Sequence, residues 1–249
     1  MAEWFDLAFG PWYLRLYPHR DLEEARRAVR FLAPRLPSDG IVLDGGCGPG
    51  RHLLALRERG FQPVGLDRSR ALLGEAAARA PDLVRSLVRG DLRALPFRDG
   101  AFAAVLSMFT SFGYFGSRRA DGELLLEFRR VLRRDGRLVL DYLNAPAVRE
   151  RLVPRSERMV DGHRVIERRS IERSGADESV VKVLTVEDGD GRVVAEYREA
   201  VALYGRDEIV AMARYAGFRL LEARGDYDGA PWSPSAPRLL LVAAPGGDA

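Results

Sequence analysis

Lysine, side-chain amides and cysteine are all scarce in this 249-residue sequence. Lys182 is the only lysine among 39 basic residues, and Asn144 and Gln62 are the only side-chain amides. The single cysteine, Cys47, excludes an intrachain disulfide and is typical of a reducing cytoplasm. Few thermolabile amides, one cysteine and 14 prolines also favour a heat-adapted source.

Long apolar runs are absent as well, since no stretch approaches the roughly 18 apolar residues of a membrane-spanning helix. The first residues lack the basic start and apolar stretch of a secretory signal. We therefore expect a cytoplasmic protein with no membrane partner. His19, His52 and His163 are scattered without metal-ligand spacing, so no metal site is predicted. Because 36 acidic residues are interspersed with the basic ones, the charge gives little support to a nucleic-acid partner.

The stretch 41–50, IVLDGGCGPG, is the most informative part of the sequence. It predicts a short buried strand that ends at Asp44 and runs into a turn made almost entirely of glycine. The following residues, RHLLALRERG, predict an amphipathic helix. Glycines let a ligand approach the backbone, and the first N–H groups of a helix can bond it. The sequence therefore predicts a small-molecule site at this turn.

Downstream, predicted strands alternate with predicted helices, which indicates a doubly wound α/β sheet. The strands are expected at 63–66, 83–88, 102–108, 137–142, 218–223 and 238–243, and the helices at 71–80, 117–134 and 206–216, with one more helix upstream at 22–33. Asp21 and Ser69 are placed to cap two of these helices. Ligands of such sheets bind at the carboxyl ends of the strands, where Asp44, Asp67 and Asp91 are expected.

Residues 158–203 have a different pattern, because polar and apolar residues alternate and two glycine-containing turns interrupt them. This predicts an antiparallel meander of about three strands. We therefore divide the chain into an aromatic and helical N-terminal cap at 1–37, a core at 38–150 and 204–249, and a β insertion at 151–203 on the substrate side. The cap includes Trp4, Phe5, Phe9, Trp12, Tyr13 and Tyr17.

The spacing of the glycines discriminates between two cofactor classes. Dinucleotide sites need G-x-G-x-x-G, but Arg51 stands where the third glycine belongs. Gly46, Gly48 and Gly50 instead form G-x-G-x-G, which favours a ligand without a pyrophosphate. A nicotinamide-dependent oxidoreductase of similar fold and a non-catalytic cofactor-binding scaffold remain as alternatives.

In these motifs the chain resembles the class I S-adenosylmethionine-dependent methyltransferases over most of its length. VLDGGCGPG, GLDRS and RGDLRALPF are similar to the first three motifs of that family. An SFGYF segment at 111–115 and the meander resemble a subgroup of small bacterial and archaeal members. The resemblance implies a seven-stranded Rossmann-like sheet of order 3-2-1-4-5-7-6 with the last strand antiparallel. It also implies S-adenosyl-L-methionine as cofactor and S-adenosyl-L-homocysteine as product.

The resemblance and the chemistry of that cofactor suggest roles for particular residues. Asp67 can accept hydrogen bonds from both ribose hydroxyls, and Asp91 suits the adenine amino group. Asp44 suits the ammonium group of the methionine end, Arg20 its carboxylate, and Tyr13 the sulfonium. The predicted cofactor contacts lie in the N-terminal segment or at strand ends: Tyr13, Arg20, Asp44, Gly46, Cys47, Gly48, Gly50, Asp67, Arg68, Asp91, Leu92, Ser107, Met108 and Phe109.

The sequence says less about the methyl acceptor than about the cofactor. Transfer from an activated donor can require only that the protein aligns the acceptor with it, so no particular catalytic residue is needed. No catalytic residue is assigned, and Cys47 is interpreted as a small residue that the turn requires. SMFT at 107–110 stands in place of [ND]-P-P-[YF], which argues against DNA amino methylation. The acceptor pocket is expected between the N-terminal segment, residues 112–115, residues 142–144 and the meander. These walls are mainly aromatic, which favours a small organic acceptor. RNA and protein acceptors stay open, and a homodimer is compatible with the sequence.

Overall fold

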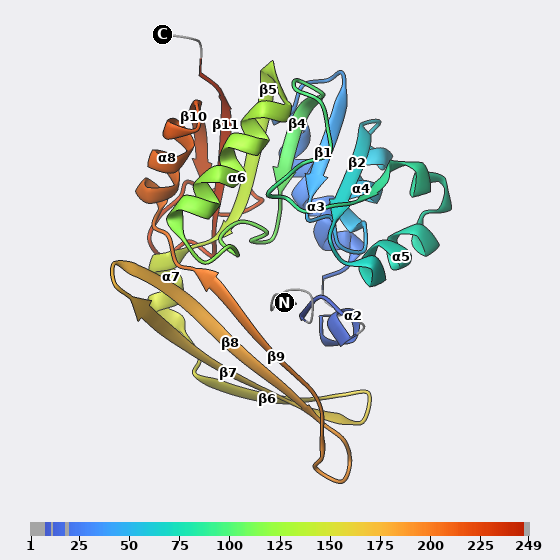
Figure 1. The fold of residues 1–249 in the computed structure, drawn as a ribbon, viewed down its shortest axis with the longest axis vertical. Helices are drawn as coiled ribbons and strands as arrows, with labels where there is room; N and C mark the ends of the chain where they lie inside the picture. Colours follow the sequence, from blue (N-terminus) through green and yellow to red (C-terminus); the bar gives the residue numbers. More distant parts are fainter. Residues whose placement is uncertain (1–7, 11, 18–19, 247–249) are drawn as a thin grey trace.

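The computed structural model describes residues 8–10, 12–17 and 20–246. Its main sheet has seven strands in the order β10-β11-β5-β4-β1-β2-β3 (Figure 1). Only β11 runs antiparallel to its neighbours β5 and β10. The predicted order and the antiparallel last strand are therefore confirmed. The strands are β1 Ile41–Gly45, β2 Gln62–Asp67, β3 Leu87–Arg89, β4 Phe102–Ser107, β5 Leu132–Leu143, β10 Phe218–Arg224 and β11 Arg238–Pro245.

Helices cover both faces of this sheet, and the alternation of strand side chains explains why. In β4, Val105 packs into the core beneath α6 and α8, whereas its neighbour Leu106 packs into the core beneath α3 and α4. Asp21 and Ser69 accept the helix N–H groups that they were predicted to cap. The helices are α3 Leu22–Leu32, α4 Arg51–Glu58, α5 Arg70–Arg79, α6 Arg118–Val131, α7 Ala145–Arg151 and α8 Arg206–Tyr215.

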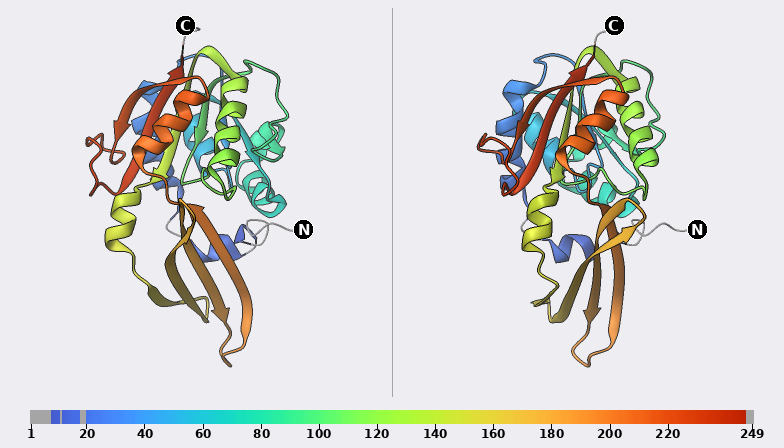
Figure 2. Two further views of the ribbon diagram at one scale, coloured as in Figure 1. Left: turned by 60° about the vertical axis from the view of Figure 1, so that its left-hand side comes forward. Right: turned by 90° about the vertical axis from the view of Figure 1, so that its left-hand side faces the viewer.

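The insertion is a second antiparallel sheet that projects from the main sheet (Figure 2). It has four strands rather than about three: β6 Arg155–Val160, β7 His163–Ser174, β8 Asp177–Glu187 and β9 Val193–Ala202. The extra strand is β6, whose first four residues are polar. An edge strand with few apolar residues leaves little hydrophobic pattern, so the prediction began only at Arg158. The short helix α7 was not predicted.

Two strands of the main sheet differ from their predicted limits. Residues 81–86 form a 3₁₀ helix that begins at Pro81, so β3 is limited to Leu87–Arg89. Leu83 packs beside Cys47 instead of pairing in the sheet. Strand β5 starts at Leu132 directly after α6, and the pairing register with β4 shifts between Phe102 and Ala104.

The N-terminal segment contains the short helix α2, Trp12–Leu16, which packs on the meander. Leu16 is buried against Val165, Leu184 and Val186 of that sheet. Trp4, Phe5 and His19 lie outside the described residues. Among the described helices, none is long and apolar enough to cross a membrane.

A buried hydrogen bond between α6 and the start of α8 gives a test of the core. The Tyr204 hydroxyl donates to Asp121 Oδ2 at 2.8 Å, and both side chains are buried. Burial raises the pKa of Asp121 to about 6, although this hydrogen bond acts in the opposite direction.

We expect Tyr204→Phe to lower the free energy of unfolding by about 1–3 kcal/mol, because a buried carboxylate loses a donor. Urea unfolding should show a larger loss at pH 8, where Asp121 is ionised, than at pH 5, where it is mostly protonated. Tyr215→Phe, at a side chain that is 85% exposed, is the control. Equal losses in the two variants would contradict a structural role for this bond.

Candidate functional site

A cavity of about 540 Å³ lies at the carboxyl ends of β1, β2 and β4. Residues from the N-terminal segment, the glycine turn, the start of α5 and the loop after β4 form its walls. Of the predicted contacts, eleven line it: Tyr13, Arg20, Gly46, Cys47, Gly48, Asp67, Arg68, Asp91, Leu92, Met108 and Phe109. Asp44, Gly50 and Ser107 are not among its lining residues.

The glycine turn is fastened to the end of β2. Gly46, Gly48 and Gly50 have left-handed φ values of +78°, +53° and +78°. The N–H groups of Gly46 and Cys47 donate to the Leu66 carbonyl at 2.8 and 3.0 Å. Gly48 N–H donates to Asp67 Oδ2 at 2.8 Å. The N–H groups of the turn are thus bonded within the protein, and the turn forms a fixed floor for the cavity.

The two carboxylates at the ends of β2 and β3 have different surroundings. Asp67 accepts one backbone N–H on each oxygen, from Gly48 and from Ser69 at 2.8 Å. Burial raises the pKa of Asp67, although these backbone donors oppose that shift. Asp91 instead binds the guanidinium groups of Arg68 and Arg93, each at 2.7 Å. Partial burial would raise the pKa of Asp91, but hydrogen bonds from the arginines outweigh it and lower the pKa to about 2.

Asp44 and His52 form a buried polar pair beneath the turn. The Asp44 carboxyl oxygens have no hydrogen-bond partner within the described part of the chain, and His52 Nε2 has none either. Asp44 Oδ2 lies 4.0 Å from His52 Nδ1. Burial raises the pKa of Asp44 to about 7, against the opposing charge of Arg51. Burial together with the charges of Arg51 and Arg238 lowers the pKa of His52 well below its ordinary value, so the imidazole is neutral.

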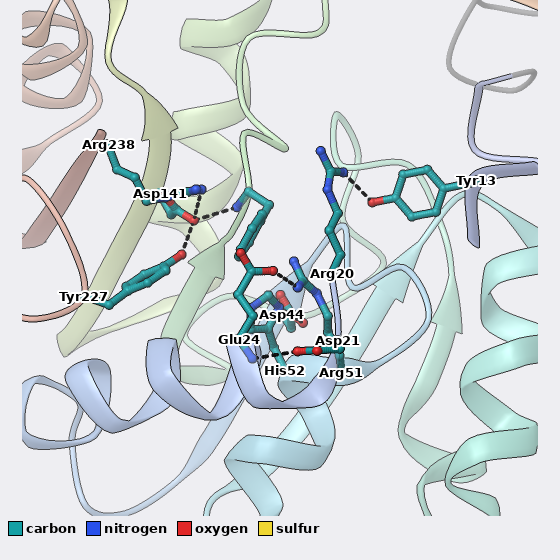
Figure 3. Close-up of polar contacts among 11 residues, drawn as sticks. Tyr13, Arg20, Asp21, Glu24, Asp44, Arg51, His52, Asp141, Tyr227 and Arg238 are labelled. Atoms are coloured by element: carbon teal, nitrogen blue, oxygen red, sulfur yellow. Dashed lines mark hydrogen bonds and ion pairs between the residues drawn. The ribbon is translucent and has the colours of Figure 1, made fainter. Parts of the chain in front are cut away.

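The loop after β4 is held in an uncommon conformation. Phe109 and Thr110 have φ values of +53° and +64°, which side chains other than glycine seldom adopt. Phe109 N–H donates to Asp141 Oδ2 at 2.9 Å, and Thr110 N–H to the Asp141 carbonyl at 2.8 Å. The Asp141 carboxylate also binds Arg238 and the Tyr227 hydroxyl (Figure 3). This network places the Phe109 ring in the cavity wall.

Some cavity residues were not predicted as contacts, among them Arg51 and His52. Arg51 pairs with Glu24 of α3 (Figure 3) and lies 4.0 Å above the Phe109 ring. Tyr114, from the segment 112–115 that is expected beside the acceptor, also lines the cavity. The sequence contains two signals for this region. Asp141 lies inside the apolar run of β5, and His52 follows closely after the glycine turn. Cys47 is buried, and burial raises the pKa of its thiol, which fits the interpretation of a small structural residue.

The N-terminal segment supplies the remaining wall through aromatic and cationic side chains. Arg20 Nη1 donates to the Tyr13 hydroxyl at 2.8 Å (Figure 3). The Phe9 ring stacks on Tyr114 with centroids 5.9 Å apart and meets Tyr13 edge-on at 5.3 Å. Within the described residues, no group of three or more histidines, cysteines or acids is placed to hold a metal ion.

Residues 42–136 match the family described as a methyltransferase domain. The chain is 34% identical over 119 residues to the dTDP-3-amino-3,4,6-trideoxy-alpha-D-glucopyranose N,N-dimethyltransferase of Streptomyces venezuelae, covering 47% of this chain and 48% of that relative. It spans about half the length of several curated relatives that it matches.

Solved structures extend the likeness to nearly the whole chain. The CcbJ methyltransferase from Streptomyces caelestis has a TM-score of 0.82 at 18% identity, covering 97% of this chain and 99% of that one, which shows a shared fold. S-adenosylmethionine-bound CalS10, an amino pentose methyltransferase from Micromonospora echinaspora, has a TM-score of 0.68 at 26% identity, covering 94% and 96%.

The glycine turn, the strand order and these likenesses agree with one another. They confirm the predicted family and its cofactor, S-adenosyl-L-methionine, and they disfavour the nicotinamide-dependent alternative. Residues 42–136 carry the signature of a methyltransferase domain, and over nearly its whole length the chain is similar to S-adenosylmethionine-dependent methyltransferases.

Proposed function

We propose that this protein transfers a methyl group from S-adenosyl-L-methionine to an amine nitrogen of a small molecule. The observation that carries the proposal is one continuous cavity, lined both by Gly48 and Asp67 and by the aromatic side chains of Phe9, Tyr13 and Tyr114. Its aromatic lining suits a compact organic acceptor better than a polymer. Relatives named for dimethylating an amino sugar nucleotide and for methylating an amino pentose support nitrogen as the acceptor atom.

The residues at the glycine turn fit the nucleoside part of the cofactor. The Asp67 carboxylate accepts backbone hydrogen bonds from Gly48, Arg68 and Ser69, and its two oxygens offer about four acceptor sites, so capacity remains for a ribose hydroxyl. Leu92 and Met108 line the cavity and can contact the faces of the adenine ring. Asp91 and Arg68 would bind its polar edge. When bound, the cofactor supplies a methyl group already activated on a sulfonium.

The methionine end of the cofactor fits the part of the cavity lined by Gly46 and His52, and Asp44 is buried behind this wall with Oδ2 4.0 Å from His52 Nδ1. The two Asp44 carboxyl oxygens do not line the cavity, but they are without a partner in the described part of the chain, a costly arrangement that a ligand ammonium group reaching them would relieve. Arg20 is available for the ligand carboxylate, and the Tyr13 ring lies beside it. Gly50 and Ser107 then act through the shape of the turn and strand end, rather than through contact.

In this proposal the protein contributes alignment and exclusion of water more than acid–base chemistry. Burial raises the pKa of Tyr114, so its phenol stays protonated and can hold an acceptor nitrogen by a hydrogen bond. His52 is buried and neutral, with Nε2 lacking a protein partner in the described residues. We assign no general base, because an amine that reaches the cavity uncharged needs none before transfer.

We further propose that the meander at 151–203 and the N-terminal cap at 1–37 form the acceptor side of the enzyme. The single buried cysteine supports a cytoplasmic location. The scarcity of amides supports a heat-adapted source, and a homodimer is compatible with the exposed edges of the meander.

Asp67 gives a direct test of ribose binding. We expect Asp67→Asn to weaken the binding of S-adenosyl-L-homocysteine by about 1–3 kcal/mol, which is roughly a 5- to 150-fold increase in the dissociation constant. The reason is that an acceptor oxygen is replaced by a donor. Titration calorimetry measures the change. Asp207→Ala, at an aspartate whose side chain is 93% exposed, is the matched control. Unchanged affinity in Asp67→Asn would show that the ribose is held elsewhere.

The pKa of Asp44 predicts how cofactor binding depends on pH. In the free protein this carboxyl titrates at about 7, and only its ionised form attracts a ligand ammonium. Affinity for S-adenosyl-L-homocysteine should therefore rise from pH 5.5 to 7 by up to about tenfold per pH unit and level off above pH 8. Asp44→Asn should bind weakly with a flat profile. A wild-type profile that is flat through pH 7 would contradict the assignment.

The acceptor is tested with methyl-labelled cofactor and a panel of amino sugars, amino sugar nucleotides, free amines, short peptides and RNA. We expect label in a small amine and none in RNA. Label confined to peptide or RNA would contradict a small-molecule acceptor. No binding of S-adenosyl-L-homocysteine at all would contradict the methyltransferase itself.

A further inference from the structure

The inner face of the meander, where helix α2 packs, includes a row made up entirely of charged residues. The strand register places Arg169, Lys182 and Glu199 directly opposite one another on β7, β8 and β9. The neighbouring row on the same face contains Leu184, which is buried beneath α2. Charges beside a hydrophobic contact are costly unless a partner meets them. Lys182, the only lysine of the chain, stands in the middle of this row.

Lys182 has two partners, and one of them, Tyr17, comes from the N-terminal segment. Lys182 Nζ donates to the Tyr17 hydroxyl and lies 4.9 Å from the centre of the Tyr17 ring. It also forms an ion pair with Glu199 at 2.7 Å. The side chains of Lys182 and Glu199 are only 16% and 20% exposed, so solvent screens the pair less than a surface pair. Lys182 therefore links Tyr17 to the middle of the meander.

From Tyr17 the contacts continue to the cavity. The Arg20 guanidinium lies 4.3 Å from the Tyr17 ring centre, and the Tyr13 ring centre lies 5.2 Å from it. Arg20 and Tyr13 are joined by a hydrogen bond, and both line the cavity. Tyr17 and Lys182 do not line it. Tyr17 therefore connects Lys182 to the cavity wall.

We propose that Lys182 is a positioning residue that holds Tyr17 on the meander and thereby fixes Tyr13 and Arg20 in the cavity wall. The proposal rests on the proposed function only in that the wall closes over the cofactor and its acceptor. The ammonium group is suited to this place, because a compact point charge can serve Glu199 and the Tyr17 hydroxyl together. Without it, α2 would keep the apolar contacts of Leu16, the Arg15–Asp161 ion pair and the hydrogen bond from Arg158 to the Leu16 carbonyl, but Tyr17 would lose its hydrogen bond to the meander.

Limited trypsin digestion tests the link without any ligand. The Arg15–Leu16 bond lies in α2, and Leu16 is 2% exposed, so cleavage there requires the segment to leave the meander. We expect Lys182→Met to be cut at this bond about fivefold faster than the wild type, since loss of the buried contacts favours local opening. Lys182→Arg should recover part of the protection, because the charge returns.

The matched control is Arg168→Met, which removes a charge from the exposed outer face of the same sheet. Mass spectrometry of the 15–16 cut and the thermal midpoint of each variant separate local opening from general unfolding. A cleavage rate in Lys182→Met equal to that of the wild type and of Arg168→Met, at unchanged thermal midpoint, would overturn the proposal.

Binding of S-adenosyl-L-homocysteine tests the effect on the cavity. We expect Lys182→Met to raise the dissociation constant about three- to tenfold, because a smaller fraction of the molecules has the cavity wall in place. Lys182→Arg should rescue part of this loss. Faster cleavage with unchanged affinity would show that Lys182 only anchors α2, which also overturns the proposal. If the wild type binds no S-adenosyl-L-homocysteine, the proposed function fails by itself, and the cleavage rates still decide whether Lys182 holds Tyr17.

Discussion

The attachment of the glycine turn to the end of β2 is the constraint on which the cavity depends. A Cβ atom at Gly46 would lie 2.6 Å from Ser111 Oγ, in a backbone conformation that already favours glycine. A Cβ atom at Gly65 of β2 would lie 2.7 Å from Cys47 Sγ. The turn and the strand can approach only because both positions lack a side chain. That approach brings Gly48 N–H to the Asp67 carboxylate, so a single acidic residue fixes the turn and still faces the cavity.

Two buried aspartates near this turn, Asp141 and Asp44, differ in whether the protein supplies hydrogen-bond partners for their carboxyl groups. Asp141 receives Arg238, the Tyr227 hydroxyl and Phe109 N–H, so its charge is fully met within the protein. Such a satisfied network rigidifies its surroundings, and here it maintains the left-handed backbone at Phe109. Asp44 is equally buried but lacks a hydrogen-bond partner among the described residues. The first aspartate shapes the wall, whereas the second is placed to gain from a cationic ligand group.

The sequence permitted prediction of the parts whose signal is local. The glycine turn, the acids at 44, 67 and 91, and the caps at Asp21 and Ser69 each depend on a few adjacent residues. Residues 83–86 belong to a 3₁₀ helix and not to the predicted strand, because the apolar residues Leu83 and Val84 suit either conformation. The pairing of Arg68 with Asp91 and the donors to Asp141 could not be predicted, because these partners are distant in sequence. The charged row of the meander requires the exact register of three strands, which a one-residue slip would destroy.

The walls of the cavity are held together by contacts between segments that are distant in sequence. The meander is attached to the core where Ala202 N–H donates to the Gly113 carbonyl and the Tyr142 hydroxyl donates to the Ala202 carbonyl. These bonds join β9 to the loop that carries Tyr114, a residue of the cavity wall. The N-terminal segment is attached on both sides. The Ser69 hydroxyl of the core donates to the Phe9 carbonyl at 2.8 Å, and α2 meets the meander through a small apolar cluster, the Arg15–Asp161 ion pair and the hydrogen bond from Arg158 to the Leu16 carbonyl. The cavity therefore requires the main sheet, the meander and the N-terminal segment to fold together, because each of them supplies or holds part of its wall.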